Sequence, residues 1–235
     1  GTADVILLTA DGGGIDIAEM TTLTKFEKLT IANNASTGTI VLDELNIDDG
    51  RTFTVDASAI TTASNTFTFN AADDTNGILV VNGSAGIDTI TMSASDQGDT
   101  LSLAGANDII YVAGTNKLTS ADTINGGGGT DTLSYTSDEA IDDLDFTLVT
   151  NLEKLTAANG VQMTGTLAVK AKDAGITTVT FNDDGDGDNL VIAAAFTNAL
   201  TVNLDDGDNV LDASAYTGTI TVSITEAIAN DASDT

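Results

Sequence analysis

Short runs in which apolar residues alternate with threonine occur along the whole chain, separated by turns rich in Asp, Asn and Gly. This two-residue period predicts short β-strands with one buried face. Proline is absent, which suits closely stacked strands that need every backbone N–H. The clearest expected strands are residues 52–55, 66–69, 78–81, 177–181, 199–202 and 219–222.

Strands at this spacing predict an all-β fold. We expect a stacked β-solenoid of the parallel β-helix kind, in which each coil buries its apolar side against the next. A β-sandwich repeat is the alternative. A helical pattern of apolar residues is confined to two short stretches, around residues 17–29 and 140–155.

The chain also repeats its own sequence. Phe26-Glu-Lys-Leu-Thr-Ile-Ala-Asn33 corresponds to Leu152-Glu-Lys-Leu-Thr-Ala-Ala-Asn159. We therefore expect two copies, residues 1–128 and residues 129–235. The chain starts on a Gly-Thr like the one that follows its internal glycine run, and stops on an Asp-Thr like the one that precedes it. These matching ends predict that the sequence is a segment of two copies from a longer repeat array.

The strongest candidate site is the segment Asp-Thr-Ile-Asn-Gly-Gly-Gly-Gly-Thr-Asp-Thr-Leu-Ser, residues 122–134. Glycine permits tight turns that aim backbone carbonyls inward, and aspartate supplies the hard anionic oxygen that suits Ca²⁺. Asp122 begins the same pattern nine residues before Asp131, and Leu133 is expected to point the other way, into a core. A flexible linker is the alternative, but a linker needs no Asp and Leu at fixed offsets. The fixed positions of the glycine pattern are Gly126, Gly127, Gly129, Asp131 and Leu133.

A second candidate is a pair of acidic turns, Asp186-Gly-Asp188 and Asp206-Gly-Asp208. Their separation of 20 residues is close to one coil, so stacking would place Asp188 beside Asp208. Adjacent carboxylates repel unless a cation lies between them, which predicts further metal ligands here. Ordinary solvated Asp-Gly turns are the open alternative.

A third set keeps only parts of the glycine pattern. Asp88, Asp99 and Asp108 are each followed two residues later by an aliphatic residue. We expect these turns to be calcium sites as well, although some have lost the ion and kept the fold.

Composition narrows the function classes. The chain carries 36 acidic against 7 basic residues, a net charge of −29, which disfavours nucleic acid and anionic membranes as partners and favours divalent cations. A hydrophobic fraction of 41% supports a buried core instead of disorder. Cys and His are absent, so disulfides, zinc–thiolate sites and Ser-His-Asp triads are excluded, and Trp is absent where a glycosidase needs aromatic platforms. No apolar run approaches the roughly 20 residues of a membrane span. We expect no enzymatic activity.

Residues 122–134, with the looser turns at Asp88, Asp99 and Asp108, resemble the calcium-binding repeats of RTX (repeats-in-toxin) proteins. The wider acidic, Thr/Ala/Asn-rich pattern resembles S-layer and giant surface proteins of Gram-negative bacteria. The resemblance implies calcium-driven folding outside the cell after type I secretion. It also implies that Asp131 is a side-chain ligand, that residues 126–129 add carbonyls, and that Asp122 serves the neighbouring turn. RTX arrays contain many perfect units, whereas this chain has one.

These observations predict a calcium-stabilised structural module of an extracellular bacterial surface layer, filament or matrix. Its partners would be neighbouring repeats of the same chain and further copies of itself. The alternative is a ligand-binding module of a large RTX adhesin, for glycans, proteins or ice. Calcium-dependent self-assembly of the purified chain favours the first, and retention of a monomer on a glycan or cell surface favours the second.

Overall fold

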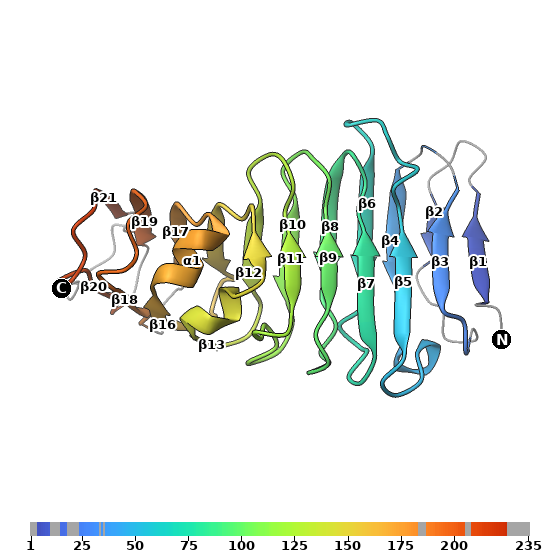
Figure 1. The fold of residues 1–235 in the computed structure, drawn as a ribbon, viewed down its shortest axis with the longest axis horizontal. Coiled ribbons are helices and arrows are strands. Elements are labelled where there is room, and N and C mark those ends of the chain that lie inside the picture. The colour runs from blue at the N-terminus through green and yellow to red at the C-terminus, as the bar shows by residue number, and fades with distance from the viewer. Residues whose placement is uncertain are drawn as a thin grey trace.

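The protein is an all-β solenoid of about nine turns, in which parallel strands stack along one axis from the N-terminal to the C-terminal end (Figure 1). The computed structural model describes residues 4–9, 15–17, 24–32, 34, 36–182, 187–204 and 208–224. All strand pairs between named strands are parallel within these ranges. The expected solenoid is confirmed, and the β-sandwich alternative is wrong.

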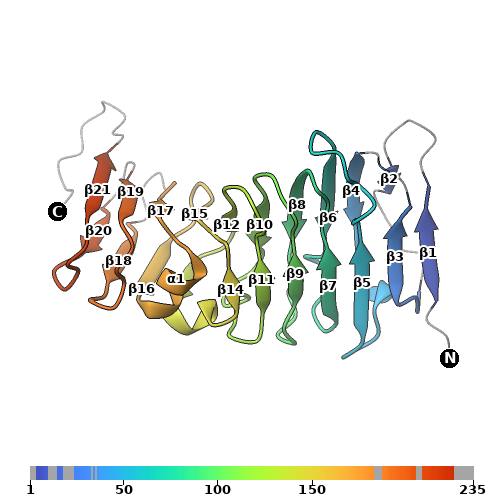
Figure 2. The same cartoon turned by 45° about the horizontal axis from the view of Figure 1, so that its top comes forward.

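The strands form three parallel sheets. The second sheet runs along the whole stack, while the first lines its N-terminal part and the third its C-terminal part (Figure 2). The first sheet contains β1 (Val5–Leu8), β3 (Lys28–Ile31), β5 (Thr52–Asp56), β7 (Ile78–Asn82), β9 (Thr100–Ser102), β11 (Thr123–Asn125) and β14 (Val149–Thr150). The second contains β2 (Ile15–Ile17), β4 (Thr37–Val41), β6 (Thr66–Asn70), β8 (Ile87–Thr91), β10 (Ile109–Val112), β12 (Thr132–Tyr135), β15 (Lys154–Ala157), β17 (Thr178–Thr180), β19 (Leu200–Leu204) and β21 (Ile220–Ile224). The third contains β13 (Glu139–Ile141), β16 (Met163–Leu167), β18 (Asn189–Ile192) and β20 (Val210–Asp212).

Alternation along each strand builds the core. In β6 the rings of Phe67 and Phe69 are fully buried and stack with centroids 6.2 Å apart, while the alternating Thr66 and Thr68 are partly exposed. The neighbouring strand β7 buries Leu79 and Val81 in the same way. All six expected strands are present, as β5, β6, β7, β17, β19 and β21. The buried residues form one continuous cluster along the solenoid.

The alternation in β8 gives a matched test of this core. Ile90 is fully buried, whereas Ile87 on the same strand is 43% exposed. We expect Ile90→Val to lower the free energy of unfolding by about 1 kcal/mol, because it leaves a methyl-sized void. Ile87→Val should change it by less than about 0.5 kcal/mol. Urea unfolding of both variants measures the difference, and equal effects would contradict the assigned alternation.

The expectation of helix in two stretches is wrong where the structure describes them. Residues 140–155 form part of β13, a 3₁₀ turn η2 (Asp143–Phe146), β14 and the start of β15. The apolar spacing arises because Phe146 of the 3₁₀ turn, Val149 of β14 and Leu152 of the bend after β14 are all buried. Residues 28–29 belong to β3, and residues 18–23 lie outside the described part. A second 3₁₀ turn, η1, spans Glu44–Asn46.

The first sheet gives way to the third sheet in the coil that contains β13, η2 and β14. Strand β14 is the last strand of the first sheet and pairs with β11, while β13 begins the third sheet and pairs with β16. The six-residue helix α1 (Val169–Ala174) packs against η2 here. The carboxylate of Asp143 accepts the N–H groups of Ala168, Lys170 and Ala171, and so ties the helix start to the preceding coil. We refer to residues 135–146 as the shoulder.

The two matching Glu-Lys-Leu-Thr segments lie in different sheets. Lys28 begins β3 of the first sheet, and Lys154 begins β15 of the second. Strand pairing continues across the expected boundary at residue 128, since β12 pairs with both β10 and β15. The division into copies 1–128 and 129–235 stays a sequence prediction. No helix among the described residues is long and apolar enough to cross a membrane.

Candidate metal centre

The glycine-rich segment forms one of three stacked bends that connect the first sheet to the second. We call residues 83–88, 103–108 and 126–131 the glycine corner. The bend at 126–131 lies directly against the bend at 103–108, with a parallel bridge between Gly105 and Gly128. The hydrogen bond from Gly128 N to Ala104 O measures 3.3 Å. The turns that keep only part of the glycine pattern and the segment that keeps all of it therefore form one continuous corner.

Close stacking of backbones explains the fixed glycines. A Cβ at Gly129, where φ is +140°, would lie 1.7 Å from Ala106 O. A Cβ at Gly127, where φ is +92°, would lie 2.5 Å from Leu103 O. Gly128, which fills a variable position of the pattern, has only one atom within 4 Å of such a Cβ, at 4.0 Å. The positions of Gly127 and Gly129 thus follow the approach of the preceding coil, whereas a Cβ at Gly126 would lie 2.1 Å from Asn151 O in the following coil.

The acidic residues of the corner form a hydrogen-bonded series along the solenoid axis. Asp88 N donates to Asp108 Oδ1 at 2.8 Å, and Asp108 N donates to Asp131 Oδ1 at 2.8 Å. Asp131 N in turn donates to Glu153 Oε2 at 2.8 Å. Each side chain accepts an N–H that the bend leaves without a strand partner. We call Asp88, Asp108, Asp131 and Glu153 the carboxylate ladder.

The ladder aspartates point into the solenoid. Asp131 and Leu133 are both fully buried, as are Asp88 and Ile90. Residues two apart on a strand share a face, so the Asp-x-apolar spacing places both side chains inward. Leu133 is in the core as expected, but the expectation that it points away from the Asp131 side chain is wrong.

Burial and mutual repulsion raise the pKa values of these carboxyl groups. Burial raises the pKa of Asp108 to about 7, and the nearby carboxyls of Asp88 and Asp131 add to the rise. The pKa of Asp88 is raised to about 6 by burial, against the hydrogen bonds from Ser84 that lower it. Burial also raises the pKa of Asp131. The ionised ladder is therefore unfavourable without added positive charge.

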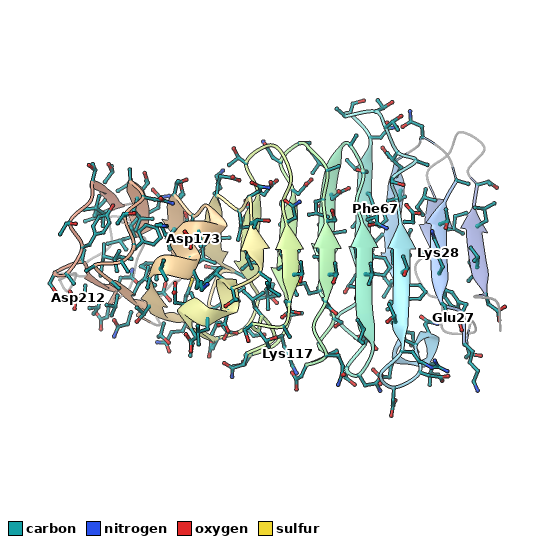
Figure 3. All side chains as sticks on the ribbon, viewed as in Figure 1. Glu27, Lys28, Phe67, Lys117, Asp173 and Asp212 are labelled. Atoms are coloured by element: carbon teal, nitrogen blue, oxygen red, sulfur yellow. The ribbon has the colours of Figure 1, made fainter. Side chains whose placement is uncertain are left out.

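No basic side chain in the described ranges pairs with the ladder. The ion pairs found there join Lys28 to Asp56, Lys117 to Asp96 and Lys172 to Asp173, all partly exposed. Figure 3 places the labelled Lys28 and Lys117 at separate places along the solenoid. The positive charge that the ladder requires must come from protons or from a bound cation.

Asp99 and Asp122 occupy the other bend, which returns the chain from the second sheet to the first. Asp99 N donates to Asp122 Oδ1 at 2.6 Å, and Leu79 N donates to Asp99 Oδ1 at 3.0 Å. Burial raises the pKa of Asp99 to about 6. Asp122 and Asp131, nine residues apart, thus belong to bends at the two ends of strand β11, and each stacks with its own series.

The acidic turns near the C-terminus do not stack as expected. The register pairs Asn189 with Val210, so the residue that meets Asp188 is Asn209. Asp188 N donates to Asn209 Oδ1 at 3.1 Å, while Asp208 is exposed. The expected adjacency of Asp188 and Asp208 is wrong by one residue, because this coil spans 21 residues in the register and not 20. Asp186 and Asp206 lie outside the described residues.

Two features of the glycine corner suit a hard cation. Asp108 Oδ2 and Asp131 Oδ2 are buried without a hydrogen-bond partner, and carboxylate oxygens are preferred ligands of Ca²⁺. Within the described ranges, however, no three Asp or Glu residues gather closely enough to hold a metal by themselves. Any ion here needs backbone carbonyls or water as further ligands, as a glycine-rich bend provides.

Glu153, Ser84 and Ser93 belong to the site although they lie outside the glycine and aspartate patterns. Glu153 ends the ladder, and the hydroxyls of Ser84 and Ser93 donate to Asp88 and Asp99 at 2.6 and 2.9 Å. Glu153 lies one coil after Asp131, in the repeated Glu-Lys-Leu-Thr segment. Its distance of one coil from Asp131 is the signal that marks it in the sequence.

Comparison with known proteins adds no relationship. No family model, curated protein or solved structure matches the chain.

Proposed function

We propose that this chain is a calcium-stabilised, non-enzymatic structural module of a large extracellular bacterial protein, a surface layer, filament or matrix of the RTX type. The observation that carries the proposal is the pair of buried carboxylate oxygens at Asp108 and Asp131, which have no hydrogen-bond partner in a corner with no basic side chain. Calcium would neutralise them where its concentration is millimolar, outside the cell. Ion binding would then be coupled to folding.

The ends of the solenoid support stacking on further repeats. The side chains of Val5 and Leu7 in β1 are more than half exposed, and so is Ile224 in β21. Both strands lie at the ends of their sheets, where one edge of each backbone has no strand partner among the described residues. Unpaired parallel edges with apolar side chains favour addition of another coil. Neighbouring repeats or a second copy of the chain would supply it.

Neutralising one ladder carboxylate tests the proposal. We expect Asp131→Asn to remove most of the rise in melting temperature that millimolar Ca²⁺ gives the wild type, because it replaces an anionic ligand by a neutral one. Without calcium the variant should melt at or above the wild-type temperature, since one repulsive charge is gone. Thermal unfolding by circular dichroism, with and without a chelator, measures both effects, and light scattering in the same titration reports assembly.

Asp73→Asn is the matched control, because Asp73 is exposed. It removes the same formal charge and should keep the full calcium response. An equal calcium response in wild type and Asp131→Asn would contradict the role of the glycine corner.

A further inference from the structure

We propose that the outer side of the second sheet, from β4 to β21, binds the surface of an ice crystal. We call this side the threonine face; it goes beyond the structural function proposed above and uses no residue of the glycine corner. Its side chains point away from the core because buried and partly exposed residues alternate along each strand. In β19, for example, Leu200, Val202 and Leu204 are buried, whereas Thr201 and Asn203 are partly exposed.

The strand register arranges the threonine face in two parallel rows, and it continues without a shift from β4 to β21. The first row has threonine at seven of its nine positions: Thr39, Thr68, Thr89, Thr132, Thr178, Thr201 and Thr221. The second row has Thr, Ser or Asn at seven of nine: Asn70, Thr91, Ser134, Thr156, Thr180, Asn203 and Ser223. These groups form a grid in which neighbouring strands lie about 4.8 Å apart and the rows about 6.6 Å apart.

The threonine face carries no acidic residue from β4 to β21, although the chain has 36 of them. Its one charged residue is Lys154. The outer side of the first sheet differs, since Lys28 forms an ion pair with Asp56 there. Basic partners and cations are attracted to the acidic remainder of the surface. The threonine face is therefore suited to an uncharged ligand.

The hydroxyls of the first row are available to an external ligand. Thr89, Thr178 and Thr201 are partly buried, and their hydroxyls form no hydrogen bond within the part of the chain that the structure describes. In the second row, Ser134 is 6% exposed, and its hydroxyl also lacks a partner there. Polar groups this buried are normally hydrogen-bonded. Because threonine is stiff at χ1, partial burial fixes where each hydroxyl and methyl group lies.

Side-chain hydrogen bonds join consecutive coils along the second row. Asn203 Nδ2 donates to Thr180 Oγ1 at 2.9 Å, and Asn182 Nδ2 donates to Thr156 Oγ1 at 3.0 Å. The Thr180 hydroxyl keeps its own hydrogen for a bond to the outside, whereas that of Thr156 donates to Ala157 O at 3.2 Å. The row is thus ordered before any ligand binds, which lowers the entropic cost of binding.

A rigid lattice of water molecules is the ligand that fits this grid. One hydrogen bond from a hydroxyl to water is weak in net terms, so binding requires many contacts made at once. The nine strands extend over about 40 Å along the axis of the solenoid (Figure 1). The spacing between strands is close to a repeat distance between oxygen atoms in hexagonal ice. The threonine methyl groups exclude disordered water between the hydroxyls.

Other uncharged ligands fit the threonine face less well. Sites for small molecules are concave and mostly apolar, unlike an outward face of hydroxyls. Stacking on sugar rings needs several aromatic side chains, whereas Tyr111 is the one aromatic residue in the two rows. Ile109, Tyr111 and Lys154 interrupt the grid near its middle. The block of β17, β19 and β21 has Thr, Ser or Asn at every position of both rows, so the test is placed there.

Uptake of the full chain into slowly growing ice, in millimolar Ca²⁺, tests the proposal. We expect the wild type to be enriched in the ice fraction. Thr201→Lys should lower this uptake at least about threefold, because a long side chain in the middle of the block holds neighbouring hydroxyls away from a rigid lattice. Thr221→Lys, at an exposed position of the same row, should act in the same direction with less risk to folding.

Thr100→Lys is the matched control, because Thr100 is a partly exposed residue of β9 on the outer side of the first sheet. It adds the same side chain and charge and should leave uptake unchanged. All variants should keep the circular dichroism spectrum and calcium response of the wild type, which separates this result from the proposed function. Exclusion of the wild type from ice, or equal uptake of Thr201→Lys and Thr100→Lys, would overturn the proposal. Binding of the wild type to crystalline cellulose, or dimerisation through this face, without uptake into ice would overturn it in favour of a polysaccharide or a second copy of the chain.

Discussion

Replacing Gly129 by alanine should unfold much of the glycine corner, whereas the same replacement at Gly128 should be nearly neutral. A Cβ at Gly129 would lie 1.7 Å from the Ala106 carbonyl oxygen, and the residue has φ of +140°. That clash is with backbone of the preceding coil, so relief requires moving a coil. We expect a loss of at least about 4 kcal/mol in the free energy of unfolding, within the range of the most damaging single substitutions.

Gly128→Ala is the control because it adds the same methyl group one residue away. Its Cβ would meet one atom, at 4.0 Å, in ordinary contact. A change within about 1 kcal/mol is expected, in part because alanine restricts the unfolded chain. Chemical denaturation of both variants in chelator measures the effect without any contribution from calcium. Similar losses at both positions would show that glycine is needed here for flexibility and not for coil stacking.

The second large effect is an inverted dependence of stability on pH. In the absence of divalent cations, the melting temperature should be higher at pH 5 than at pH 7.5. The pKa values of Asp88 and Asp99 are raised to about 6, and that of Asp108 to about 7. Between the ordinary aspartate pKa of about 4 and these values, the folded chain binds more protons than the unfolded chain. Stability therefore falls as pH rises through this window.

The magnitude is large because several carboxyl groups share the effect. A rise of two units on one carboxyl corresponds to about 3 kcal/mol, so a total on the order of 5 kcal/mol is expected after allowance for coupling between neighbours. Thermal scans in chelator from pH 4.5 to 8 measure it, with high salt added to screen surface repulsion. Millimolar Ca²⁺ should raise the curve mainly at the alkaline end. Asp108→Asn should flatten the profile, and a profile that rises with pH in chelator would contradict the assigned burial.

The solenoid could be predicted because its main signal is local. Alternation along runs such as Thr66–Asn70 fixes a strand and its inward face, and the turns between them fix the coil length. The helical pattern at residues 140–155 was misleading, because inward side chains of a 3₁₀ turn and two short strands imitate a helical period. Periodicity reports which residues are buried, and it does not by itself report the backbone that buries them.

Many residues of the candidate site could be predicted from the sequence, but the residues that they contact in neighbouring coils could not. The spacing of Gly126, Gly129 and Asp131 marked the corner, yet partners depend on a register that varies from coil to coil. Asp108 meets Asp131 after 23 residues, while Asp88 meets Asp108 after 20. A constant offset of 20 residues between coils predicts that Asp188 lies against Asp208. The register of this coil differs by one residue, so Asn209 lies there instead. The shoulder was not predictable, since it depends on a change of sheet.

The hydrogen bonds of the carboxylate ladder all point one way. In each step the later coil supplies the accepting carboxylate, and the earlier coil supplies the N–H. A bend at 103–108 is therefore complete only when the bend at 126–131 has closed over it, and that bend in turn depends on Glu153. Each bend of the glycine corner is thus completed by the coil that follows it. Loss of one coil should loosen the coils before it more than those after it.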